Sequence, residues 1–142
     1  MVVGMTAEPF RPVLRTQADV EAMWRKLMTP LGFRSCSLWM ISIQDDRPIP
    51  SLLEIARTET EPEDGDAEAL AGVLRHLASP RHRFAFLRSR PGSGRPDASD
   101  VAWARAVARA GPLAGARLEV VHLAHAQDIY PLPLDDLLAE PA

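Results

Sequence analysis

The chain has 142 residues, of which 46% are hydrophobic and 25% are charged, and this composition is typical of one globular domain. Its formal net charge of −3 and its 6% of aromatic residues argue against a nucleic-acid-binding protein, which usually carries a basic surface and aromatic side chains for base stacking. No apolar run approaches the roughly 18 residues that a membrane span needs, and the start of the chain contains no signal-peptide core. We therefore expect a cytoplasmic protein that contacts neither nucleic acid nor membrane.

Cysteine and lysine are both rare in the chain. Cys36 is the one cysteine, which excludes an internal disulfide framework and fits a reducing compartment. It lies beside an apolar run, so we interpret it as a buried structural thiol. Lys26 is the one lysine, whereas arginine and alanine are abundant, a bias expected of a GC-rich bacterial gene.

The first half of the chain predicts a helix followed by a hairpin. After a flexible N-terminal segment over residues 1–15, Thr16 and Asp19 have the spacing of a capping box at the start of a helix. Residues 35–43 carry apolar side chains at both odd and even positions, which predicts a strand covered on both faces. Across a turn with the sequence QDDRP, residues 49–57 are predicted to return as the second strand of a hairpin.

The middle of the chain predicts a helix, a strand and another helix. Residues 58–66 are polar and acidic, and we interpret them as a solvated connection, with an acidic docking surface as the alternative. Asp66 is expected to cap the second helix. Residues 83–89 (RFAFLRS) predict a buried strand, and a third helix is expected to begin near Asp97 and to stop at the Gly-Pro pair 111–112.

The last part of the chain predicts more strand. Residues 116–125 (ARLEVVHLAH) predict a fourth strand, and a short extended piece follows before a C-terminal tail over residues 135–142. The expected fold is one mixed α+β domain over residues 16–134, a three-layer-like arrangement. It would contain three helices, an N-terminal hairpin and a mixed sheet of about five strands, the later ones parallel through a right-handed crossover.

The loop with the sequence LRSRPGSGRPDASD, residues 87–100, and the order of the elements around it resemble the JAB/MPN metalloprotease-like fold, especially its bacterial RadC branch. In that family a strand ends in His-x-His-Pro, and a loop with glycine leads to Ser-x-x-Asp at the start of a helix. Here Pro91 and Gly92 resemble the proline and glycine, and Asp97-x-x-Asp100 resembles Ser-x-x-Asp in a loop about one residue shorter. The resemblance extends from about Thr16 to Leu134.

The resemblance implies a domain that has lost its metal. The family's two histidines and its aspartate hold a catalytic zinc, but this chain has Arg88 and Arg90 at the histidine positions and keeps only Asp100. A guanidinium has no lone pair for a metal, so we expect no metal, no cofactor and no catalytic residue at this site. Glu54 is the residue that would match the family's upstream glutamate, and the other interpretation is an outward-facing strand carboxylate.

The two arginines offer a physical replacement for the metal. Alternate residues of a strand point the same way, so both guanidinium groups are expected to enter the space of the zinc and to pair with Asp100, and with Asp97. A non-catalytic interaction or scaffold module is therefore the expected function. Its partner would be another protein or, in a homodimer, a second copy of the chain, bound through an exposed sheet edge.

Two other functions remain open from the sequence. The same loop lies before a helix amino terminus, where a small anionic ligand would be stabilised, although its acidic residues would oppose an anion. That site would consist of Arg88, Arg90, Arg95 and Asp97, the N–H groups of Gly92 and Gly94, and Asp100. The second alternative is a hydrolase with a site that no motif reveals.

The histidines do not have the spacing of a metal site. His122 and His125 are three residues apart on a predicted strand, which places their side chains on opposite faces, and His76 and His82 flank a turn. In the resemblance, His122 takes the place of a histidine in the family's closing strand. We expect His122 to be a hydrogen-bonded core residue.

Overall fold

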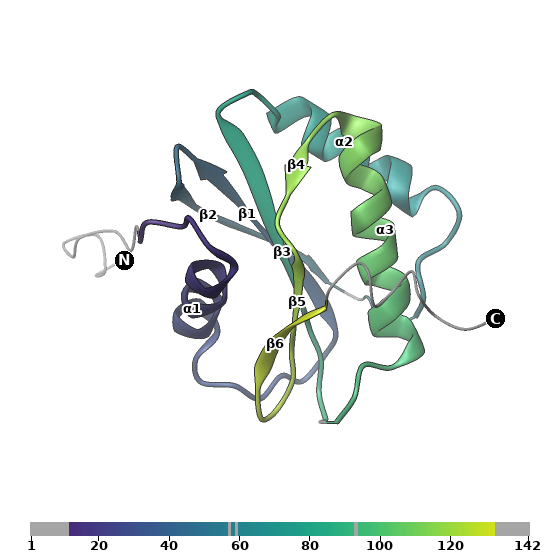
Figure 1. Cartoon of the computed structure of the whole chain (residues 1–142). Helices are drawn as coiled ribbons and strands as arrows, with labels where there is room; N and C mark the ends of the chain where they lie inside the picture. The colour runs from purple at the N-terminus through teal and green to yellow at the C-terminus, as the bar shows by residue number, and fades with distance from the viewer. Residues whose placement is uncertain (1–11, 57, 59, 93, 133–142) are drawn as a thin grey trace, which may run out of the picture.

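The structure is a computed structural model that describes residues 12–56, 58, 60–92 and 94–132. A mixed sheet lies between two helical layers, with α1 on one face and with α2 and α3 on the other (Figure 1). In chain order, the elements are α1 (Gln17–Met28), β1 (Ser37–Gln44), β2 (Arg47–Ala56), α2 (Asp66–Leu77), β3 (His82–Ser89), α3 (Ala98–Ala114), β4 (Arg117–Leu118), β5 (Val121–Ala124) and β6 (Ile129–Leu132). The prediction of one mixed α+β domain is confirmed.

The strands lie in the order β2-β1-β3-β5-β6, and β4 pairs with the start of β3. β1 is antiparallel to β2 and β3, β5 is parallel to β3, and β6 is antiparallel to β5. The single strand expected over residues 116–125 is divided into β4 and β5. Between them the Glu119 N–H donates to the Phe84 carbonyl at 2.8 Å, which keeps this irregular step attached to β3.

Both faces of the central strands are buried, as the sequence predicts. Leu38 and Phe86 pack in the cluster under α2 and α3, whereas Ile41 and Leu87 pack in the cluster under α1. The alternation follows from the period of two residues along a strand. For any other residue of β1, β2 or β3, the pairing partner in the neighbouring strand therefore shows whether its side chain faces α1 or faces α2 and α3.

The start of α1 is correctly predicted and the start of α2 is not. In α1 the Asp19 N–H donates to Thr16 Oγ1 at 3.1 Å, and the Thr16 N–H donates to Asp19 Oδ2 at 2.9 Å, which completes the capping box. In α2 the cap is Gly65, with a φ of 98°, and Asp66 is already the first helical residue. The Asp66 carboxylate accepts from the Glu63 N–H at 2.7 Å instead, so it closes the turn before the helix.

The expected stop of α3 at residues 111–112 is wrong, because the helix continues to Ala114. Its left-handed C-cap is Gly115, with a φ of 65°. Pro112 stands in the last turn. Gly111 serves packing rather than termination, because a Cβ at this position would lie 2.8 Å from Leu118 Cδ1 of β4.

The end of the N-terminal segment is packed, not flexible. Leu14 is fully buried in the cluster under α1, and its N–H donates to the Asp46 carbonyl at 2.7 Å. Residues 1–11 of that segment and the tail over residues 135–142 lie outside the described residues.

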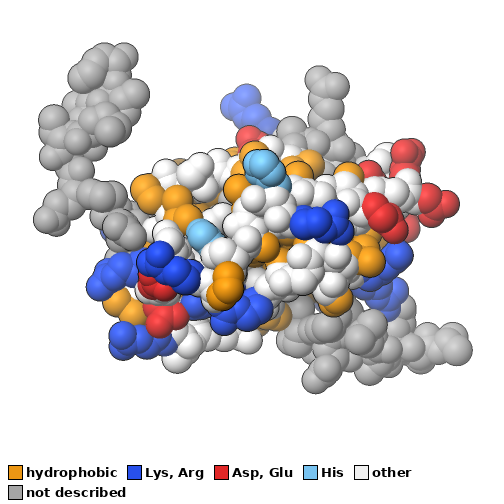
Figure 2. Space-filling model, turned by 90° about the horizontal axis from the view of Figure 1, so that it is seen from above, with side chains coloured by type: hydrophobic (Ala, Val, Ile, Leu, Met, Phe, Trp, Pro, Cys, Tyr) orange, Lys and Arg blue, Asp and Glu red, His pale blue; other side chains and the backbone are white. Residues whose placement is uncertain are grey.

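The outer surface carries mixed charge. On the face drawn in Figure 2, basic, acidic and apolar side chains are interspersed, and no continuous basic stripe forms there. In the part of the chain that the structure describes, no helix is both long enough and apolar enough to cross a membrane.

Candidate functional site: a buried arginine–aspartate cluster

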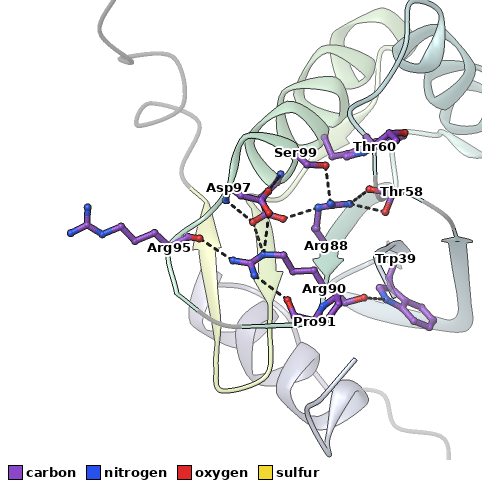
Figure 3. Close-up of polar contacts among 12 residues, drawn as sticks. Trp39, Thr58, Thr60, Arg88, Arg90, Pro91, Arg95, Asp97 and Ser99 are labelled. Atoms are coloured by element: carbon purple, nitrogen blue, oxygen red, sulfur yellow. Dashed lines mark hydrogen bonds and ion pairs between the residues drawn. The ribbon is translucent and has the colours of Figure 1, made fainter. Parts of the chain in front are cut away.

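Arg88, Arg90 and Asp100 meet where β3 ends and α3 begins, and we call these three residues the Arg–Asp cluster (Figure 3). Arg88 is the penultimate residue of β3, Arg90 follows the strand, and Asp100 lies in the first turn of α3. The exposed fractions are 1% for Arg88, 7% for Arg90 and 0% for Asp100. Charged side chains are rarely buried this far unless they are paired.

Both oxygens of the Asp100 carboxylate are occupied. Oδ1 accepts from Arg88 Nε at 2.9 Å, and Oδ2 accepts from Arg90 Nε at 2.7 Å. Oδ2 also accepts from the Asp97 N–H at 2.8 Å, while the Asp100 N–H donates to Asp97 Oδ1 at 2.8 Å, which forms the capping box of α3. The ion pairs expected from the sequence are therefore present. They join the end of β3 to the start of α3.

Arg88 uses its outer nitrogens on residues that the sequence did not single out. Nη1 donates to the carbonyl and to Oγ1 of Thr58, at 2.9 and 2.6 Å, and Nη2 donates to Ser99 Oγ at 3.0 Å. Thr58 is only 1% exposed, so the expectation of a solvated connection is wrong at its first residue. Nothing in the polar sequence of this segment separates Thr58 from the exposed Thr60 and Glu61.

Arg90 organises its own loop. Its Nη1 donates to the Pro91 carbonyl at 3.1 Å, and its Nη2 donates to the Arg95 carbonyl at 2.9 Å. The loop is also tied to the β5–β6 hairpin, because the Gly92 carbonyl accepts from the Ala126 N–H at 2.8 Å and the Gly94 carbonyl accepts from the Tyr130 hydroxyl at 3.1 Å. The loop after β3 is therefore held by hydrogen bonds from the Arg90 side chain and by hydrogen bonds from the β5–β6 hairpin.

This geometry favours internal ion pairing over an external anion. Every nitrogen of the Arg88 and Arg90 guanidinium groups already donates to a protein oxygen. The Arg95 side chain points away from the cluster (Figure 3). Asp97 stands at the rim, with its side chain 56% exposed and its Oδ2 4.0 Å from Arg90 Nε. Of the residues predicted to bind an anion, Asp97 and Asp100 lie beside Arg90, and Asp100 also pairs with Arg88. The Arg95 side chain takes no part in this cluster (Figure 3).

Glu54 lies on the opposite face of the sheet from the cluster. In the register, Glu54 pairs with Trp39, whereas Arg88 pairs with Leu38, and neighbouring residues of β1 point to opposite faces. Glu54 is exposed and accepts from Ser37 Oγ at 2.8 Å. It is an outward-facing strand carboxylate, and it cannot act together with Asp100.

The histidines take separate positions. His122 is fully buried, as expected; neither ring nitrogen makes a hydrogen bond of standard geometry within the described chain, and the Val120 backbone is the one hydrogen-bonding group that favours its charged form. Burial lowers the pKa of its imidazole below the ordinary value of 6.5. His125 Nδ1 accepts from the Gln127 N–H at 3.1 Å. Among the residues that the structure describes, no three His, Cys, Asp or Glu side chains are grouped as a metal site.

A comparison with protein-family models finds no match, and a search of curated proteins finds no significant relative. The fold and the site define a mixed α+β domain with a buried arginine–aspartate cluster at the carboxyl end of β3. The resemblance to the JAB/MPN fold stays a prediction.

Proposed function

We propose that the chain is a non-catalytic JAB/MPN-like domain that serves as an interaction or scaffold module, with the Arg–Asp cluster in place of a metal centre. One observation supports this proposal above the others. Asp100, which matches the family's aspartate ligand, has both carboxylate oxygens occupied by Arg88 and Arg90, which stand at the positions of the family's histidines.

The chemistry of the cluster supports a structural role. A guanidinium stays protonated in proteins, so it can neither ligate a metal nor act as a general base. The Asp100 carboxylate has no exposed surface and cannot reach a substrate. Removing one partner of a buried ion pair typically costs about 3–5 kcal/mol, because an uncompensated charge stays behind. The cluster therefore fastens α3 and its preceding loop to β3.

Restoring the histidines tests the resemblance. The double variant Arg88→His/Arg90→His would place two imidazoles beside Asp100, which is the three-ligand set that a catalytic zinc needs. We expect this variant to bind about one zinc ion per chain, and the wild type to bind none, in an equilibrium titration with a chromogenic zinc chelator. The matched control, Arg88→Met/Arg90→Met, removes the same charges without adding ligands. A histidine variant that binds no more zinc than the methionine control would contradict the resemblance.

The sheet edge is the surface that the proposal assigns to a partner. Within the described chain, β2 pairs with β1 only, and Leu52 and Leu53 in the middle of β2 are 39% and 41% exposed. Pro48 and Pro50 lack the N–H that an added strand needs, so pairing would be limited to the part of β2 after Pro50. Light scattering over a range of concentrations should show self-association that Leu53→Asp abolishes. A monomer at every concentration would exclude a second copy as the partner.

A further inference from the structure

His122 lies at the interface between α1 and the sheet. In the register of β5 it pairs with Leu87 of β3 and with Pro131 of β6. Leu87 belongs to the cluster under α1, so the imidazole is directed to the same layer. Its exposed fraction is 0%, and neither Nδ1 nor Nε2 is hydrogen-bonded to any described residue. An imidazole therefore lies beneath a helix with no hydrogen-bonded side chain among the described residues.

The layer around His122 is apolar. Val20, Trp24 and Met28 of α1 face Leu87 of β3 and Ile129 of β6 there. The Trp24 indole Nε1 is also buried without a hydrogen-bond partner in the described chain. A neutral imidazole has one donor and one acceptor, whereas a protonated imidazole has two donors and a charge. Protonation inside this layer would therefore leave a desolvated charge, which the nearby Val120 backbone favours, but desolvation outweighs that contribution.

The charged groups that face His122 do not compensate such a charge. From α1 these are Glu21, whose carboxylate favours the imidazolium, and Arg25, which opposes it. The two form an ion pair with each other at 3.3 Å. Arg25 also holds α1 to the β5–β6 hairpin, because its Nη2 donates to Asp128 Oδ1 at 2.8 Å and to the Ile129 carbonyl at 2.7 Å.

Besides the Val120 backbone, the described residues of the other elements bring no charged partner to His122. Its register neighbours on β3 and β6, Leu87 and Pro131, carry no titratable group. In the hairpin turn, His125 accepts from the Gln127 N–H, and Asp128 is paired with Arg25. That pairing holds the pKa of Asp128 below its usual value, so Asp128 stays ionised in mildly acidic solution. His122 is therefore the fully buried titratable group of this interface, and it has no charged partner of its own.

We propose that His122 makes the docking of α1 on the sheet acid-sensitive. The uncharged imidazole is tolerated under α1, whereas the imidazolium forms readily only when α1 leaves the sheet and water reaches the ring. Release of α1 exposes the apolar face of the sheet that carries Ile41, Leu87 and Ile129. The inference rests on the α1 interface alone, and it holds whether or not the domain is a JAB/MPN-like module.

The direction of the effect follows from proton linkage. Burial lowers the pKa of His122 in the docked state, and the exposed ring of the released state has the ordinary value of 6.5. The released state therefore binds more protons between these two pKa values. Docking is strongest above pH 6.5, weakens as the pH falls below 6.5, and becomes constant again below the lowered pKa. Within that window the opening constant rises by up to about tenfold for each pH unit.

Hydrogen exchange of the whole chain, measured by mass spectrometry between about pH 7.5 and about pH 5 and corrected for intrinsic exchange, tests the proposal. Peptides of α1 should lose protection by up to about tenfold for each pH unit below the ordinary pKa, while peptides of β1 and β3 keep theirs. His122→Leu should remove the pH dependence. The control His76→Leu, at an exposed position of α2, should retain it.

Two results would overturn the proposal. One is an unchanged pH dependence of α1 in His122→Leu, and the other is an equal loss of protection in α1 and β3, which would mean global unfolding. If His122→Leu does not fold, the imidazole resonances of the wild type decide the matter by NMR. His122 should then titrate below the ordinary imidazole pKa of 6.5, and a His122 that titrates at that ordinary value would refute the inference.

Discussion

Arg88 of β3 and Asp100 of α3 form an ion pair from which solvent is excluded, with Nε and Oδ1 2.9 Å apart and exposed fractions of 1% and 0%. A second guanidinium, that of Arg90, shares the same carboxylate at 2.7 Å. Such an arrangement costs desolvation of three charged groups, and it is stable only because hydrogen bonds satisfy the remaining donors. The cluster therefore makes the carboxyl end of β3 sensitive to single substitutions.

Asp100→Asn should be among the most destabilising changes in the chain. The substitution keeps the size of the side chain but removes the charge that Arg88 and Arg90 share, so we expect a loss of about 3–5 kcal/mol in the free energy of unfolding. Urea unfolding measures this loss. Asp64→Asn is the matched control, because Asp64 is exposed, and it should change stability by less than about 0.5 kcal/mol. Equal losses in the two variants would show that the ion pairs contribute little.

Thr58→Val should weaken the same cluster by a smaller amount. Its hydroxyl accepts from Arg88 Nη1 at 2.6 Å, while the Thr58 carbonyl would remain as an acceptor for that nitrogen. A lost hydrogen bond to a charged group corresponds to about 1.5–3 kcal/mol in unfolding free energy. A double-mutant cycle with Arg88→Met separates the contact from other effects of each substitution. Strict additivity of the two losses would contradict a direct role of Thr58 in holding Arg88.

The two loop glycines should resist substitution, unlike a glycine in a helix. Gly92 and Gly94 have φ values of 82° and 96°, so Gly94→Ala should destabilise the fold by about 1–2 kcal/mol. Gly72 lies in α2 with no atom within 4 Å of a built Cβ, and Gly72→Ala should stabilise the fold by about 0.5–1 kcal/mol. Thermal unfolding of the two variants should therefore give shifts of opposite sign. A stabilising Gly94→Ala would mean that the loop is not held in this conformation.

Anions should have no specific effect on stability. The guanidinium nitrogens of Arg88 and Arg90 already donate inward, so phosphate should raise the melting temperature equally in the wild type and in Arg90→Gln after correction for their different starting stability. Phosphate and sulfate stabilise most proteins by exclusion from the surface, which makes this comparison necessary. A rise that depends on Arg90 would instead support the small-anion function.

The sequence predicts the elements of this fold well and their edges less well. Local signals lie within a few residues, so the capping box of Thr16 and Asp19 and the two-faced burial of β1 are both predictable. The end of α3 cannot be predicted from local signals, because Gly111 is required by its close contact with Leu118 of β4 and does not end the helix. The helical spacing of Leu70, Val73, Leu74 and Leu77 suggests one buried stripe, but this prediction is only half correct. Leu70 and Leu74 are buried together with Ala67 and Ala71, whereas Val73 and Leu77 are 42% and 41% exposed.

Part of the candidate site is also predictable, because its three main residues lie close together in the sequence. Arg88, Arg90 and Asp100 lie within one strand–loop–helix unit, so alternation along the strand and the helix start bring them together. Thr58 reaches Arg88 from a segment 30 residues away in the sequence, and no local pattern marks it. The missing partner of His122 depends on how α1 packs against β5, which again requires the tertiary structure.

The metal content of the untagged wild-type protein, purified without added chelator and measured by inductively coupled plasma mass spectrometry, tests the central claim most directly. Under the proposed resemblance, Arg88 and Arg90 take the place of the family's metal ligands, so we predict only trace zinc. About one zinc ion per chain would contradict the account, because a structural zinc site needs about four coordinating groups that the Arg–Asp cluster does not supply.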